Sequence, residues 1–199
     1  MDKLDSESYD GQALSGLDLR GAVLAGKEFV SCRIEHCDFT EADISRCVFE
    51  DCRFVSCNFS NLVIRGSRLA GSTFEECKLV GLNFGACDQL VFDAEFLGCR
   101  LSSCNFSELK MKGAKIKDCR LEACYFQNAY LVGAAFDGSQ FDGVLFHECD
   151  LTRASFRKAS GYAIDPRVNK VEKAVFGLPD ALGLLGCFGI KLESSGDES

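Results

Sequence analysis

Every fifth residue along most of this chain is large and apolar. Counting in fives from Leu14 to Phe84, and again from Phe96 to Phe156, gives 28 positions that hold only Phe, Leu, Ile or Met. Because the chain is 47% hydrophobic, a chance match at all of them has a probability on the order of one in a billion. Neither the helical period of about 3.6 nor the strand period of about 2 produces this spacing. A short fixed repeat of this kind predicts a solenoid.

A small residue stands two places before most of the large ones. It is Ala, Cys or Ser at 21 of the 28 positions, as with Cys37 before Phe39 and Ala42 before Ile44. Each unit therefore points one small and one large side chain inward, and a glycine often follows where a turn needs a positive φ. Five residues form one side of a square coil, so four sides make a coil of about twenty residues, and coils stack at about 4.8 Å.

These units resemble the A(D/N)Lxx consensus of the pentapeptide-repeat family. Matching stretches are C-D-F-T-E at 37–41, A-D-I-S-R at 42–46, C-N-F-S-N at 57–61 and C-D-L-T-R at 149–153. The resemblance covers roughly residues 10–176. It implies an all-β fold, a right-handed quadrilateral parallel β-helix.

The predicted organisation has four parts. They are an N-terminal tail at 1–9, the β-helix at 10–176, a capping and dimerisation α-helix at 177–192 and a disordered tail at 193–199. Pro179 suits the first turn of the helix, and Asp180 complements its positive end. An apolar surface on this short helix predicts pairing of two copies. The residues assigned to this homodimer contact are Leu182, Leu185, Phe188 and Ile190.

The repeat is interrupted at 85–95. The large residue Phe96 comes seven residues after the repeat position at Gln89, so two residues are extra. Two interpretations stay open: a bulge whose apolar residues fold back into the core, or a loop that contacts a partner. The candidate contact residues are Asp88, Leu90, Val91 and Phe92.

The thirteen cysteines follow the repeat. Eleven occupy the small inward position, Cys87 fits the same register, and Cys187 does not. Their spacing in fives differs from the C-x(2–4)-C pairs of zinc sites. We predict free thiols that pack as small apolar groups, which suits a reducing, cytoplasmic location. A thiol-based redox enzyme would instead need an exposed thiolate of low pKa.

Motifs of catalysis are missing from the sequence. The two histidines, His36 and His147, occupy outward repeat positions, and no phosphate-binding, nucleophile-elbow or zinc-protease motif occurs. The longest apolar run, 174–190, is interrupted by Pro179 and Asp180, so we expect no membrane span. The sequence predicts a protein that is not an enzyme and that has no catalytic residues, cofactor or metal site.

Negative charge is concentrated in the first half of the chain. The net charge is −8; residues 1–95 hold 17 acids and 9 bases, and residues 96–199 hold 13 of each. Glu35 and Glu75 are forty residues apart and should share one side with Glu76 beside them, and Glu50 and Asp51 should adjoin it. We predict these five as a partner-binding acidic face.

The C-terminal region narrows the resemblance. D-P-R-V-N at 165–169 and L-P-D-A-L-G-L-L at 178–185 are similar to the terminus of the topoisomerase-protecting branch, which includes Qnr, MfpA, AlbG and McbG. That resemblance implies a non-catalytic, DNA-mimicking homodimer that binds DNA gyrase or topoisomerase IV. It would protect them from inhibitors, as antibiotic resistance or self-immunity, without binding nucleic acid directly.

One cluster does not fit DNA mimicry. A basic belt lies within about one coil and consists of Arg100, Lys110, Lys112, Lys115, Lys117 and Arg120. It could bind a phosphate-bearing or acidic partner, or pair with acids across a dimer. The alternative function is therefore a generic pentapeptide-repeat scaffold for an unrelated protein partner, since a fold does not fix a function.

Overall fold

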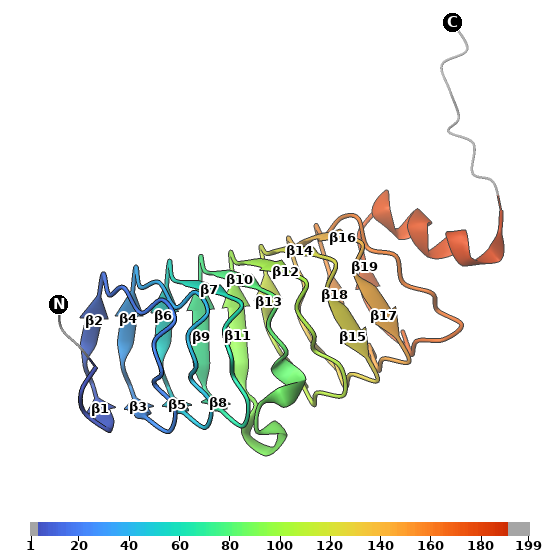
Figure 1. Ribbon diagram of the computed structural model, residues 1–199. Coiled ribbons are helices and arrows are strands. Elements are labelled where there is room, and N and C mark those ends of the chain that lie inside the picture. The colour runs from blue at the N-terminus through green and yellow to red at the C-terminus, as the bar shows by residue number, and fades with distance from the viewer. Residues whose placement is uncertain (1–3, 191–199) are drawn as a thin grey trace, which may run out of the picture.

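The chain winds into a rod of about eight stacked coils that carries a short helix at its C-terminal end (Figure 1). The computed structural model describes residues 4–190. All strands are parallel, and each pairs with the strand one coil away. The predicted β-helix is therefore confirmed. The rod has four sides, here called A to D in chain order.

Sides A and B carry the first strands of each coil. Side A consists of β1 (Ser8–Asp10), β3 (Glu28–Val30), β5 (Val48–Glu50) and β8 (Arg68–Ala70). Side B consists of β2 (Ala13–Ser15), β4 (Arg33–Glu35), β6 (Arg53–Val55), β9 (Ser72–Glu75), β11 (Ala94–Leu97) and β13 (Ile116–Lys117), then β18 (Ser155–Phe156) and β19 (Val175–Phe176). Single bridges at Ala135 connect β13 to β18.

Sides C and D complete each coil. Side C consists of β7 (Asn58–Ser60), β10 (Lys78–Val80), β12 (Arg100–Ser102), β14 (Arg120–Glu122) and β16 (Gln140–Asp142). Side D has β15 (Tyr125–Gln127) and β17 (Leu145–His147), and isolated bridges extend it toward the N-terminus. The first strand, β1, begins at Ser8, inside the range that the sequence assigned to an N-terminal tail.

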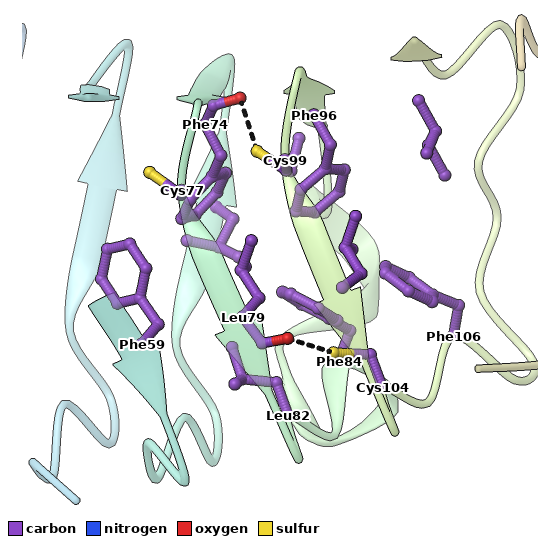
Figure 2. Close-up of a cluster of buried hydrophobic side chains, with 14 of the residues drawn as sticks. Phe59, Phe74, Cys77, Leu79, Leu82, Phe84, Phe96, Cys99, Cys104 and Phe106 are labelled. Atoms are coloured by element: carbon purple, nitrogen blue, oxygen red, sulfur yellow. Dashed lines mark hydrogen bonds between the residues drawn. The ribbon is translucent and has the colours of Figure 1, made fainter. Parts of the chain in front are cut away.

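Aromatic rings form columns along the axis of the rod. On side B, Phe54 stacks on Phe74 and Phe74 on Phe96, with ring centroids 4.8 and 5.2 Å apart. On side D, Phe84, Phe106 and Phe126 stack at 4.7 and 4.8 Å. Rings of opposite sides meet edge to face across the core, as Phe84 and Phe96 do at 5.4 Å (Figure 2). The inward positions read from the period of five therefore form one continuous apolar core.

The cysteines fill the space between these columns. All thirteen are free, and twelve are buried. Their thiols donate to main-chain carbonyl groups: Cys99 Sγ to Phe74 O at 3.3 Å, and Cys104 Sγ to Leu79 O at 3.5 Å (Figure 2). Ser139 takes an equivalent place and donates to Ile116 O at 2.8 Å. The prediction of free thiols that pack as small core groups is confirmed.

We expect a thiol reagent to modify only Cys187 rapidly in the native protein. Burial raises the pKa of the Cys52 and Cys87 thiols to about 12, so roughly 0.01% is thiolate at pH 8. The twelve buried cysteines should react at least about 100-fold more slowly than Cys187. Counting modified thiols by mass spectrometry, with urea-unfolded protein as the control, measures this. Fast modification of several thiols in folded protein would contradict it.

The interruption adds two residues to one coil. Strands pair 20 residues apart before it, as Ser8 with Glu28, and 22 apart across it, as Lys78 with Arg100. The extra residues lie beside β8 on side A, where the short 3₁₀ helix η2 (Gln89–Val91) contacts β8; a second 3₁₀ helix, η1 (Phe84–Ala86), precedes it on side D. Figure 1 shows this segment projecting from the rod. The spacing of 20 then resumes between Phe96 and Ile116.

The C-terminal helix is of a different type from the one predicted. Helix η3 (Asp180–Phe188) is a 3₁₀ helix, not an α-helix. Its two internal glycines, Gly183 and Gly186, weaken a helix by about 1 kcal/mol each relative to alanine, which is consistent with a loosely hydrogen-bonded form. Gly189 ends it with a φ of 65°, the left-handed conformation that glycine adopts at low cost. The predicted tail at 193–199, and residues 191–192 of the predicted helix, lie outside the described residues.

Candidate partner-binding surfaces

The predicted acidic face is centred on side B. Register places Glu35, Val55 and Glu75 in one outward row of this sheet, so the two glutamates do share a side. Each, however, is paired with an arginine on the same sheet: Glu35 with Arg33, and Glu75 with Arg53 at 2.5 Å. The row is therefore close to neutral. The sequence prediction considered only the acids and not these arginines. Arg33 and Glu35 are two residues apart on one strand and therefore face the same way.

The other predicted acids lie along the edges of side B. Glu50 ends β5 on side A, and Asp51 occupies the corner between sides A and B with a φ of 51°. Glu76 occupies the corner between sides B and C, where it accepts a hydrogen bond of 3.4 Å from the Ser56 hydroxyl. All three are exposed. Within residues 4–190 none of them forms an ion pair, so their charge faces solvent along two ridges.

Carboxylates on the other sides also stay ionised. The Arg20 guanidinium hydrogen-bonds the Asp18 carboxylate and lowers its pKa to about 2. The Ser45 hydroxyl and amide lower the pKa of Asp43. Acids therefore surround the N-terminal half of the rod and do not gather on one flat surface.

The interruption combines one exposed residue with a buried one. Leu90 is 93% exposed, whereas Phe92 is buried and packs edge to face on Phe84 at 5.9 Å. Asp88 pairs with Arg68 at 3.1 Å and accepts a hydrogen bond from the Leu90 amide. Val91 lies in η2. Phe92 therefore belongs to the core and is not available as a contact residue, because its ring replaces the missing repeat position. Leu90 stays a candidate for partner contact.

The C-terminal end presents an apolar surface. Leu182, Phe188 and Ile190 are exposed, and Leu185 is half-buried. The helix is attached to the last coil: Asp180 accepts a hydrogen bond of 3.3 Å from the Gly161 amide, and Leu184 packs against the core. The Arg167 guanidinium lies over the Phe188 ring at 5.7 Å. Exposed apolar side chains on an anchored helix form a suitable surface for another protein chain.

The basic belt surrounds three sides of the rod. Arg100 and Arg120 lie on side C, Lys110 and Lys112 on side A, and Lys115 and Lys117 on side B. Lys115 pairs with Glu95 at 2.7 Å. Lys78 pairs with Arg100 in the side C sheet. The sequence-based belt does not include Lys78, because the two residues are 22 apart and the repeat predicts pairs 20 apart.

Both histidines lie at outward positions of the rod. His36 is exposed at a corner of the rod, and His147 points outward from β17, as predicted. Within the described part of the chain no three metal-ligating side chains gather. None of the helices described there is both long enough and apolar enough to cross a bilayer.

Two family profiles match the chain. The one described as "Pentapeptide repeat region" matches residues 27–91, and "Pentapeptide repeats (8 copies)" matches residues 119–158. Together they cover more than half of the chain. The protein belongs to the pentapeptide-repeat family.

Solved structures of the family are similar to this rod. Trypsin-treated QnrB1, a plasmid-mediated fluoroquinolone resistance protein, matches with a TM-score of 0.54 and 20% identity, over 94% of this chain and 100% of that one. Full-length QnrB1 matches with a TM-score of 0.43 and 18% identity, over 92% and 100% of the chains. HetL from Nostoc sp., involved in heterocyst differentiation regulation, matches with a TM-score of 0.37 and 17% identity, over 84% of both. No curated protein sequence matches the chain.

Proposed function

We propose that this protein is a non-catalytic ligand of a type II topoisomerase, DNA gyrase or topoisomerase IV, and protects that enzyme from inhibitors. The observation that carries the proposal is a rod whose N-terminal half holds the excess negative charge, spread over several of its sides. Residues 1–95 have 17 acids and 9 bases. Ser8 to Glu95 fills a little over four coils, roughly 21 Å at the strand spacing. Residues 8–95 hold 14 acids and 8 bases, a net −6. That is about one net negative charge per 3.5 Å, against one per about 1.7 Å of duplex DNA.

Such a rod suits a surface built for DNA. A topoisomerase neutralises phosphates with lysine and arginine, and a narrow acidic rod meets the same groups. The protein would compete with DNA for that surface or displace a trapped drug complex, and no covalent step is needed. Likeness to QnrB1, a fluoroquinolone resistance protein, supports the same class of activity. This role places the protein in the cytoplasm and would serve as antibiotic resistance or self-immunity.

A supercoiling assay tests the proposal. With purified gyrase or topoisomerase IV and an inhibitor at its half-maximal dose, micromolar protein should restore activity. Ciprofloxacin and albicidin represent two inhibitor classes. Absence of both binding and protection with either enzyme would refute the proposal.

A charge variant tests the acidic half specifically. The double change Glu50→Lys and Asp51→Lys should lower protective potency by about tenfold, because the attractive field weakens. The double change Asp142→Lys and Glu148→Lys, at two exposed acids of the near-neutral half, is the matched control and should change potency less than about twofold. Equal loss in both variants would contradict a role for the N-terminal acids.

The basic belt favours a second candidate, a scaffold for another protein. Fold alone does not fix the partner, and HetL shows that the family includes a regulator of differentiation. Affinity capture that consistently returns one partner unrelated to topoisomerases, together with a negative supercoiling assay, would support this function.

A further inference from the structure

One outward row of side C changes from acidic to basic along the rod. Bridges and strand pairs place each member one coil from the next. From the N-terminal end the row reads Asp18, Asp38, Asn58, Lys78, Arg100 and Arg120. The interruption does not disturb it, because the extra residues lie beside β8 on side A. The strands β10, β12 and β14 that carry its basic members follow one another along the rod in Figure 1.

The basic members of this row have no anionic partner within their own coils. Lys78, Arg100 and Arg120 are exposed and stack at the strand spacing of about 4.8 Å, where like charges repel. Among residues 4–190, none of the three forms an ion pair. On side B, in contrast, Arg33, Arg53 and Lys115 each pair with a glutamate of the same sheet. Side C therefore presents these three cations, unpaired among the described residues, to an anion from outside the chain.

A second copy of the chain can supply that anion. If two rods meet side C to side C and antiparallel, a two-fold axis between the levels of Asn58 and Lys78 reverses the row upon itself. Asp18 then faces Arg120 of the other copy, and Asp38 faces Arg100. Both Thr40 donors bind Asp38 Oδ1, at 2.5 and 3.0 Å, so Oδ2 is left for the arginine. Because of the two-fold symmetry, each of these contacts occurs twice in the dimer.

The neighbouring outward row fits the same arrangement. It reads Arg20, Thr40, Ser60, Val80, Ser102 and Glu122. The same axis places Arg20 opposite Glu122 of the other copy and Thr40 opposite Ser102. Arg20 also pairs with Asp18 of its own copy at 2.6 Å. The four side chains therefore form a ring of alternating charge, made of Asp18 and Arg20 from one copy and Glu122 and Arg120 from the other. A shallow groove of about 420 Å³ lined by Lys78, Val80, Arg100 and Glu122 gives room for the facing side chains.

We infer that side C is a self-complementary surface through which two copies associate laterally and antiparallel. The contact spans six coils, roughly 25–30 Å by 10 Å. It is therefore about 300 Å² per copy, well under the roughly 800 Å² of a standard interface. This small and polar contact forms a weak dimer that depends on salt. It leaves η3 free, so it is independent of the proposed C-terminal dimer and of the proposed function.

Charge-swap variants test this pairing by sedimentation velocity. A Leu182→Asp parent, which lacks the C-terminal contact, should self-associate in 20 mM salt and become monomeric in 500 mM salt. The charge variants below are made in this parent. Asp38→Arg alone and Arg100→Asp alone should each weaken association at least about tenfold, because like charges then face each other twice. Mixing the two variants should restore it, because opposite charges meet again at both positions.

The mixture separates this pairing from other roles for the basic row. Both changes are at outward positions, and circular dichroism checks that the variants stay folded. If the mixture fails to associate while the Leu182→Asp parent does, the proposed register is wrong. If the Leu182→Asp parent does not associate in 20 mM salt, the inference is overturned. If Arg100→Asp then also loses binding to polyphosphate or an oligonucleotide, the row binds a polyanion instead.

Discussion

Replacing Phe54 by Ala is expected to lower the free energy of unfolding by about 3–5 kcal/mol. Phe54 lies on β6, is 2% exposed, and stacks on Phe74 at 4.8 Å. It also meets Phe49 and Phe59 edge to face, at 5.3 and 5.4 Å. Removing this ring opens a cavity at the junction of three sides, and the strands on either side prevent its collapse because their spacing is fixed by hydrogen bonds.

The neighbouring residue provides the control. Val55 follows Phe54 on the same strand but points outward and is half-buried, so Val55→Ala should change stability by less than about 1 kcal/mol. Urea denaturation followed by circular dichroism measures both variants against wild type. Because each coil contacts only its neighbours, the loss in Phe54→Ala should also broaden the transition. A melting curve of Phe54→Ala equal to that of wild type would place this ring outside the core.

The inward half of the structure could be predicted because one rule governs it. A coil has room for one small and one large side chain per side, so residues such as Cys37 and Phe39 repeat at fixed spacing and are buried as expected. The two extra residues near position 90 could also be counted, and the register confirms them. The sequence could not predict which apolar residue turns inward there, because Leu90 and Phe92 no longer follow a period.

The surface was harder to predict because outward positions obey no repeat. Glu35 and Glu75 were placed on the correct side, but their arginine partners were not recognised. The row from Asp18 to Arg120 was not predicted from the sequence, for a different reason. Its members are 20 residues apart except between Lys78 and Arg100, where the step is 22. Sequence proximity grouped Arg100 with lysines that lie on other sides of the rod.

Helix η3 is the surface on which the proposed homodimer depends. Substituting Asp for Leu182 should convert the dimer into a monomer. Leu182 is 45% exposed on a helix whose other face packs on the last coil, so the change should not unfold the rod. A two-fold interface carries the substitution twice. If each costs the 2 kcal/mol or more that is typical of a central contact residue, dimer affinity falls by roughly 1000-fold.

Light scattering coupled to size exclusion, in 500 mM salt to suppress polar contacts, measures the mass of each species. Leu90→Asp is the matched control, because Leu90 is more exposed than Leu182 but lies on η2, far along the chain from the helix. That variant should keep the dimer mass, while Leu182→Asp should show half of it. Monomer mass in wild type, or dimer mass in Leu182→Asp, would remove η3 from the interface. Because Leu185 is half-buried, its substitution would confound association with folding, and Leu182 gives the cleaner result.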